Sequence, residues 1–348
     1  MNVGLVGCGV IAGRYVQGAA AFDTFDVVAC SDTDGARSKA LGDAHGLAVV
    51  AVDDLFSDPE IDVVLNLTPP EAHAVVVGSA LDAGKHVYTE KPLTTSVDTG
   101  RELLAEATRL KLRIGCAPDT FLGSAYTTAR ELIARGDIGE PLGANAKMLV
   151  GGADTWHPNG DIFFRAGAGP MLDIAPYYLT AIASLLGPFE AATGFGSTPT
   201  PTRTLAVGPR AGERFAVEVP THVTAALQLV SGALATLTVS FEAQGQYESG
   251  LVVYGSEGVL ELPDANEFGG DLRVRSGRGE WQAVPYASRG AQETRGYGLH
   301  EMVQALAADR PHRASGELAL HVLETATAVL RSVEEGRTVE VTTRFDAP

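Results

Sequence analysis

The stretch NVGLVGCGVIAG (residues 2–13) decides the fold that the sequence predicts. Residues 2–6 form a short apolar strand, and a helix-compatible run continues from Ala12. Gly7 permits a tight turn, Gly9 lets the backbone approach a pyrophosphate, and the small Ala12 allows helix and strand to pack closely. A plain strand-to-helix turn is the alternative, but the context on both sides favours dinucleotide binding. We expect the turn to contact a dinucleotide through Gly7, Gly9, Val10 and Ile11.

A carboxylate follows the second predicted strand, which runs from Phe25 to Cys30. Asp32 lies 25 residues after Gly7, close to the place where such folds bind the ribose 2′-hydroxyl. A carboxylate there repels a 2′-phosphate, so NAD is favoured, with NADP possible. The alternative is that Asp32 caps the next helix, although Asp34 is better placed for that role.

A lysine stands at the carboxyl end of another predicted strand, within the sequence VYTEKP (residues 87–92). Residues 86–89 have the pattern of a short buried strand, and Pro92 cannot donate to a sheet, so the strand ends by Lys91. Ligands of open parallel sheets bind at this edge. Taken alone, Lys91 fits an ordinary surface lysine beside a turn better, and the motifs before and after it reverse that preference.

Strands and helices alternate through the first 120 residues, which predicts a parallel, doubly wound Rossmann sheet. Later residues give several consecutive short strands, typical of an α+β domain with a large, mostly antiparallel open sheet. We therefore expect a domain over 1–120 and a second over 121–348. The loops at 196–204 and 285–297 are expected to be lids or surface loops. Further helices are expected at 36–45, 71–83, 96–110, 122–135, 171–186, 300–308 and 317–335, and further strands at 61–65, 112–116, 143–150, 221–230, 233–241, 251–254, 258–262, 272–275 and 282–284.

Composition excludes several classes of function. The chain has 348 residues and a formal net charge of −17, which argues against nucleic acid or an anionic membrane as partner. Its three cysteines show no Cys-x-x-Cys spacing, so neither a disulfide framework nor a zinc site is expected, and a reducing, cytoplasmic location is the default. His300-Glu301 lacks the second histidine of a zinc-protease motif, and we predict no metal. Apolar runs are too short to span a bilayer.

Asp173 and Tyr177 lie four residues apart on the predicted helix 171–186. That spacing places them on one face, near the start of an otherwise apolar helix. Polar groups in such a place need partners, which suggests a functional site. The alternative is an aspartate that favours the helix dipole and an amphipathic core tyrosine.

Over essentially its whole length the chain resembles the glucose–fructose oxidoreductase / inositol dehydrogenase (Gfo/Idh/MocA) family. The resemblance implies an NAD(P)-dependent oxidoreductase whose lysine, here Lys91, lies beside the nicotinamide and contacts the substrate hydroxyl. Asp173 would steady that lysine, and Tyr177 replaces the histidine of inositol dehydrogenases, which weakens inositol as substrate. It also implies a homodimer or homotetramer through the second sheet. The motifs that carry it are the glycine turn, Thr68-Pro69-Pro70 with His73, GKHVYTEKP (84–92) and GPMLDIAPY (169–177); from them Thr68, Pro69, His73, Glu90 and Lys91 join the expected cofactor contacts.

Alcohol oxidation removes a hydride from carbon and a proton from oxygen, and NAD takes the hydride. A free tyrosine, with a pKa of about 10, is a poor base, but a nearby lysine ammonium lowers that pKa. We expect Tyr177 to accept the proton, Lys91 to activate it and anchor the substrate, and Asp173 to orient Lys91. Direct proton transfer to Lys91 stays open.

The expected substrate contacts are Lys91, Asp173 and Tyr177, joined by three further residues. The segment GCAPDTF (115–121) lacks the basic residue that many family members have in the equivalent segment and has Asp119 nearby, which suits a neutral polyol. Trp156 and His157 precede the 171–186 helix and offer a platform for a sugar ring, or else anchor their loop on the core. Arg165 is expected to form a loop-closing ion pair.

We expect an oxidoreductase that acts on a secondary alcohol of a sugar, sugar derivative or cyclitol. Two alternatives stay open. One is a redox-neutral enzyme that keeps its NAD and oxidises a sugar transiently. The other is a non-catalytic NAD(H)-binding sensor.

Overall fold

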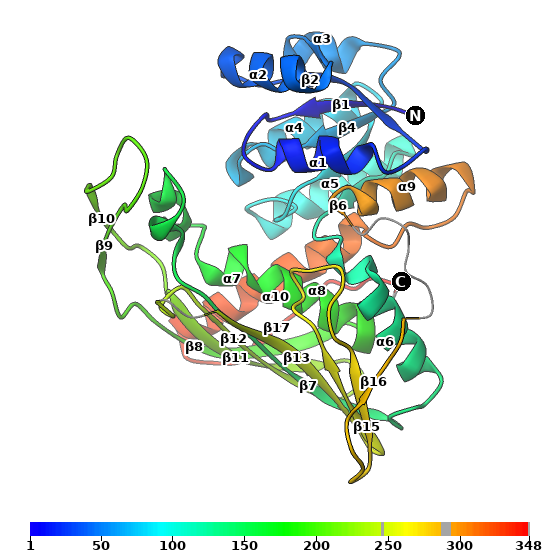
Figure 1. Ribbon diagram of the computed structural model, residues 1–348, viewed down its shortest axis with the longest axis vertical. Helices are drawn as coiled ribbons and strands as arrows, with labels where there is room; N and C mark the ends of the chain where they lie inside the picture. The colour runs from blue at the N-terminus through cyan, green and yellow to red at the C-terminus, as the bar shows by residue number, and fades with distance from the viewer. Residues whose placement is uncertain (245–246, 287–293, 347–348) are drawn as a thin grey trace. The chain divides into compact units, whose positions relative to one another are not determined.

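The computed structural model describes residues 1–244, 247–286 and 294–346, and their contacts divide the chain into two compact units (Figure 1). The first unit holds residues 1–122 and 294–320, and the second holds the remaining described residues. The division after Leu122 lies close to the boundary expected at residue 120. Residues 294–320 were expected in the continuous domain 121–348, but they belong to the first unit. The reason is that helix α9 (Tyr297–Ala307) packs on strand β6 (Ile114–Cys116) of that unit.

The first unit is built on a six-stranded sheet in the order β3-β2-β1-β4-β5-β6, in which every neighbouring pair is parallel. This is the doubly wound order, whose topological switch point lies between β1 and β4. The expected parallel Rossmann sheet is confirmed. The other strands are β1 (Asn2–Val6), β2 (Asp26–Ser31), β3 (Ala48–Val49), β4 (Val63–Asn66) and β5 (His86–Thr89), and the other helices are α1 (Ala12–Ala19), α2 (Gly35–His45), α3 (Val52–Ser57), α4 (Pro70–Asp82) and α5 (Val97–Leu110).

Strand β5 is buried on both faces, as its apolar pattern predicts. Val87 joins a core cluster with side chains of α3, α4 and α5, whereas Tyr88 points to the other face, beside Met302 of α9 and Gly115 of β6. Successive side chains of a strand alternate between faces, so helices are needed on both. The strand therefore ends in a fixed place, with Lys91 two residues beyond Thr89.

The second unit contains a nine-stranded sheet in the order β16-β15-β14-β13-β7-β12-β11-β8-β17. Only β7 and β12 among these neighbours run parallel, so the expected mostly antiparallel sheet is confirmed. Helices α6 (Ser124–Ala134) and α8 (Ala175–Leu186) pack on the sheet. The strands are β7 (Pro141–Leu149), β8 (Phe189–Ser197), β11 (His222–Leu229), β12 (Leu234–Ser240), β13 (Glu248–Gly255), β14 (Gly258–Leu262), β15 (Arg273–Ser276), β16 (Gln282–Ala283) and β17 (Val339–Glu340).

The expected continuous helix 171–186 is wrong. Its residues form a short helix α7 (Pro170–Asp173) and the longer α8, joined at Ile174. Pro176 explains the break, because it lacks an N–H and its ring clashes with the carbonyl four residues earlier, although the first turn of a new helix tolerates it. Asp173 and Tyr177 thus belong to different helices, and the argument that they share one helix face fails.

Other local predictions also differ from the structure. The expected loop 196–204 contains the end of β8 and the strand β9 (Thr202–Thr204), which pairs with β10 (Arg214–Ala216) in a separate two-stranded ribbon. Of the expected loop 285–297, residues 287–293 lie outside the described residues. Helix α10 (Gly316–Glu335) has residues in both units. Within the described ranges, each helix is too short or too polar to cross a membrane.

Candidate functional site

The glycine turn after β1 has the conformation that its sequence predicts. Gly7 has a φ of +100°, and its N–H donates to the Ser31 carbonyl at 2.8 Å. A Cβ on Gly7 would lie 2.6 Å from the backbone nitrogen of Thr68, so a side chain is excluded there. A Cβ on Gly9, in contrast, would meet no described atom within 4 Å. That open space is where a pyrophosphate would approach the backbone.

Helix α1 starts beside this space with backbone N–H groups that can hold an anion. Among the described residues, no side chain caps its start and its first turn carries no carboxylate. Such a helix start attracts a phosphate through its N–H groups and its dipole. Val10 is exposed and Ile11 is partly exposed at the turn. The residues present therefore fit a dinucleotide.

Asp32 is fixed against the glycine turn. Its Oδ2 accepts a hydrogen bond from the Cys8 N–H at 2.7 Å, and its Oδ1 accepts one from the Asp34 N–H at 2.8 Å. Asp34 caps α2 by accepting from the Ala36 N–H at 3.0 Å, so the capping alternative for Asp32 does not apply. Each carboxylate oxygen keeps a lone pair for a ribose hydroxyl.

Buried Asn66, which sequence reasoning missed, shapes the loop after β4. Its Oδ1 accepts hydrogen bonds from the hydroxyl of Thr68 at 2.7 Å and from the Thr68 N–H at 3.2 Å, and its Nδ2 donates to the hydroxyl of Thr89 at 3.1 Å. Asn66 thereby links the ends of β4 and β5. Thr68 and Pro69, both expected to contact the cofactor, follow directly on this fixed loop.

His73 was expected to contact the cofactor, but its ring lies in the interior. The side chain is fully buried, with Nε2 at 2.8 Å from the Thr68 carbonyl and Nδ1 at 2.7 Å from the Pro92 carbonyl. Both ring nitrogens are thus directed at the main chain. His73 joins the loop after β4 to the loop that carries Lys91, so any effect on a cofactor passes through those loops.

Glu90, another expected cofactor contact, also positions the backbone of Lys91. Its Oε2 accepts from the Lys91 N–H at 3.0 Å, and its Oε1 accepts from the Tyr15 hydroxyl of α1 at 2.8 Å. Burial, together with the Glu90 carboxylate, raises the pKa of Tyr15 well above its usual value, so the phenol remains a donor. Sequence reasoning missed Tyr15, because it stands in an ordinary apolar helix position.

Asp119 does not have the exposure that a substrate contact needs. Its side chain is fully buried and accepts from the N–H groups of Gly296 and Gly298, each at 3.1 Å, and from Arg295 Nη1 at 3.4 Å. Burial raises its pKa. Asp119 therefore anchors the start of α9, and the argument for a neutral polyol that rested on it no longer holds.

The three expected catalytic residues fall in different units. Lys91 is half-buried at the carboxyl edge of the first sheet, whereas Asp173 and Tyr177 are half-buried in the second unit. The N–H of Asp173 donates to the Gly169 carbonyl at 2.9 Å, and Tyr177 lies in the first turn of α8. Their meeting stays a prediction.

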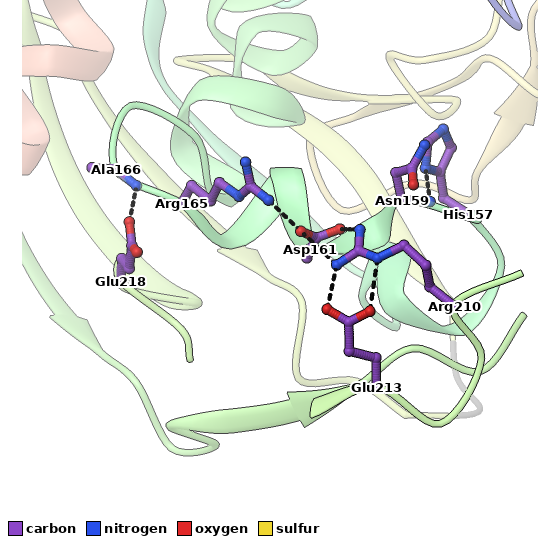
Figure 2. Close-up of polar contacts among 8 residues, drawn as sticks. All are labelled: His157, Asn159, Asp161, Arg165, Ala166, Arg210, Glu213 and Glu218. Carbon is purple, nitrogen blue, oxygen red and sulfur yellow. Dashed lines mark hydrogen bonds and ion pairs between the residues drawn. The ribbon is translucent and has the colours of Figure 1, made fainter. Parts of the chain in front are cut away.

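The segment that joins β7 to α7 carries the expected aromatic platform. Trp156 is 60% exposed, and its ring lies edge-on to that of His157 with centroids 5.5 Å apart. Figure 2 shows His157 Nδ1 accepting from the Asn159 N–H, and the ion pair that Arg165 forms with Asp161. The ion pair expected of Arg165 is confirmed. Contact of the aromatic pair with a substrate stays a prediction.

Comparison with known proteins adds an independent line of evidence. Residues 1–117 match the model of an oxidoreductase family with an NAD-binding Rossmann fold, and residues 126–261 match the GFO/IDH/MocA C-terminal domain. The 1,5-anhydro-D-fructose reductase of Ensifer adhaerens is 27% identical over 98% of each chain.

One further similar sequence and one similar solved structure agree with these matches. The dTDP-3,4-didehydro-2,6-dideoxy-alpha-D-glucose 3-reductase of Streptomyces violaceoruber is 32% identical over 76% of this chain and 73% of its own. A levoglucosan dehydrogenase solved with NADH and L-sorbose shares the fold, with a TM-score of 0.87 and 22% identity over 99% of each chain. With the glycine turn and both domain matches, these findings confirm the expected resemblance and cofactor: the chain belongs to the Gfo/Idh/MocA family of oxidoreductases with an NAD-binding Rossmann fold.

Proposed function

We propose that the protein interconverts a secondary alcohol and a ketone on a sugar, sugar derivative or cyclitol, using NAD. The observation that carries this is the first sheet's carboxyl edge, where a turn that fits a dinucleotide and the fixed Lys91 follow strands of one sheet. The names of the similar proteins, which are carbohydrate reductases and a levoglucosan dehydrogenase, support the substrate class.

In this proposal a bound nicotinamide would supply the hydride chemistry, and the residues of this chain bind the substrate and hold or move its proton. The Lys91 ammonium favours the ionised form of the Tyr177 phenol, which accepts the proton of the substrate hydroxyl. Asp173 orients Lys91. Contacts at the Lys91 N–H and the Pro92 carbonyl restrain the lysine backbone, which limits the space that its ammonium can reach.

A nicotinamide absorbance screen of the purified protein against sugars and cyclitols, with NAD and NADP, tests the proposal. Lys91→Ala and Tyr177→Phe should each lower turnover by about 10²-fold or more while NADH still binds. Near-normal turnover in both variants would remove the assignment. Consumption of substrate without net NADH would favour the redox-neutral alternative, and NADH binding without turnover would favour the sensor.

We also propose that a second copy of the chain docks on the sheet of the second unit. Leu234 and Tyr254 both pair with Gly143, which gives an apolar row across three strands, and Phe195 is 82% exposed. Large exposed apolar side chains on one sheet face are typical of interfaces between proteins. Light scattering should show a dimer or tetramer that Phe195→Lys weakens, and a monomeric parent protein would contradict the idea.

A further inference from the structure

Segment 161–169 precedes helix α7, which contains Asp173. Residues 202–219, which include the β9–β10 ribbon, hold this segment by several contacts. Asp161 is buried, and both of its oxygens accept from Arg210, at 2.9 Å from Nη1 and 3.4 Å from Nη2 (Figure 2). Glu213 orients the same guanidinium, accepting from Nε at 2.9 Å and from Nη2 at 2.7 Å. A nearly buried carboxylate paired with a planar guanidinium is a strong, directional contact.

A second attachment lies three to five residues further along the segment. The Glu218 carboxylate accepts from the Ala166 N–H at 2.9 Å, and the Glu218 N–H donates to the Phe164 carbonyl at 2.8 Å. Val219 lies against Gly169, where an added Cβ would come within 3.0 Å of its side chain. The ribbon side thus contacts the segment near its start, its middle and its end.

Backbone hydrogen bonds carry this restraint into α7. The Gly169 N–H donates to the Phe163 carbonyl at 3.0 Å, and the Gly169 carbonyl accepts from the Asp173 N–H at 2.9 Å. Gly169 has a φ of +91°, a conformation that other residues rarely adopt. A shift of the segment would therefore move the backbone that holds Asp173.

We propose that Arg210 and Glu218 are positioning residues for Asp173, acting through segment 161–169. This inference rests on the proposed function, in which Asp173 orients Lys91. The ribbon and its flanking residues then contribute to catalysis by holding the backbone that carries Asp173. A misplacement of about 1 Å remote from the chemistry is enough to lower a rate by about 10²-fold.

The test uses four variants of the full chain and one control variant. Arg210→Ala leaves Asp161 paired with Arg165, so the fold is retained, and Arg210→Lys restores the charge with a single contact. Glu218→Ala removes the acceptor of the Ala166 N–H, and Glu218→Gln keeps an oxygen there. Arg109→Ala on α5 is the control, because Arg109 makes the same kind of two-point contact with Glu106 in the first unit.

Hydrogen exchange by mass spectrometry is the first readout, since it needs no substrate. Arg210→Ala and Glu218→Ala should raise exchange over residues 161–173 by about tenfold, and leave α8 protected. The second readout is turnover of levoglucosan with NAD and of 1,5-anhydro-D-fructose with NADH. The two alanine variants should lower kcat by about tenfold or more with unchanged NADH affinity. Glu218→Gln and Arg210→Lys should recover part of the lost kcat.

Two results separate this inference from the proposed function. If the parent protein turns over a sugar and the alanine variants match it in kcat, the positioning role is wrong and the oxidoreductase proposal stands. If the parent protein is inactive with both sugars, hydrogen exchange alone tests whether Arg210 and Glu218 restrain segment 161–173. Unchanged exchange over 161–173 in the alanine variants refutes this restraint, and increased exchange there supports it.

Discussion

His73 offers a prediction in which two substitutions of one residue have different effects. Its Nε2 faces the Thr68 carbonyl on the loop after β4, and its Nδ1 faces the Pro92 carbonyl next to Lys91. The amide nitrogen of glutamine lies near the position of Nε2, and that of asparagine lies near Nδ1. His73→Gln therefore frees the Lys91 loop, whereas His73→Asn frees the Thr68 loop.

The size of each effect follows from the burial of the ring. His73 is fully buried, and a neutral imidazole carries one N–H, so the substitution that removes the donating nitrogen leaves one buried carbonyl without its donor, at a cost of about 1–3 kcal/mol of unfolding free energy. His73→Gln should lower kcat by about tenfold with NADH affinity kept, because only the lysine loop gains freedom. His73→Asn should weaken NADH binding by about tenfold, because the loop of Thr68 and Pro69 loosens.

Three measurements check this pair of variants: chemical denaturation, NADH fluorescence titration and steady-state turnover. Denaturation reports the stability of each variant, which controls for a general loosening of the core. The reasoning is refuted if both variants change NADH affinity and kcat by the same factor, or if neither variant changes either quantity. Lys91→Ala supplies the reference for complete loss of the lysine.

Three further predictions concern the interior of the molecule. Gly7→Ala should destabilise the fold, because its Cβ meets backbone, whereas Gly9→Ala should leave stability within about 0.5 kcal/mol and still weaken NADH binding, as denaturation and titration can show. Tyr15→Phe removes one hydrogen bond to Glu90 and should cost about 1–2 kcal/mol in denaturation, with a smaller loss of kcat than Lys91→Ala. Burial lowers the pKa of His321 to about 4 from 6.5, so the unfolded state takes up the proton first as pH falls. Stability should therefore drop by about 3 kcal/mol between pH 6.5 and 4, and a flat denaturation profile over that range would contradict this.

Local pattern was enough to predict the first sheet and the cofactor turn. Gly7 needs a positive φ, β5 needs apolar side chains on both faces, and Pro92 ends its strand, and each of these requirements shows in a few consecutive residues. Pro176 shows the limit of such patterns: the apolar period continued across it, but the missing N–H divided the helix.

Contacts between distant segments explain what the sequence could not predict. The loop 196–204 looked irregular because its Thr/Pro composition carries no period, yet β9 gains its partner from β10, ten residues later. His321 is fully buried and accepts from the Phe189 N–H at 2.8 Å, a contact that the sequence did not predict. In both cases the partner is a backbone group, which has no side-chain signature in a sequence.

Asp32 and Asp119 show how this affects the candidate site. Both follow a strand of the first sheet, and both accept from two backbone N–H groups, so sequence position does not separate them. The difference is that Asp119 has a returning segment over it, with Arg295 and the start of α9, whereas Asp32 remains partly exposed beside the open space at Gly9. A carboxylate can bind a ligand only where the chain leaves its lone pairs accessible. Exposure therefore keeps Asp32 as the predicted cofactor contact and gives Asp119 a structural role.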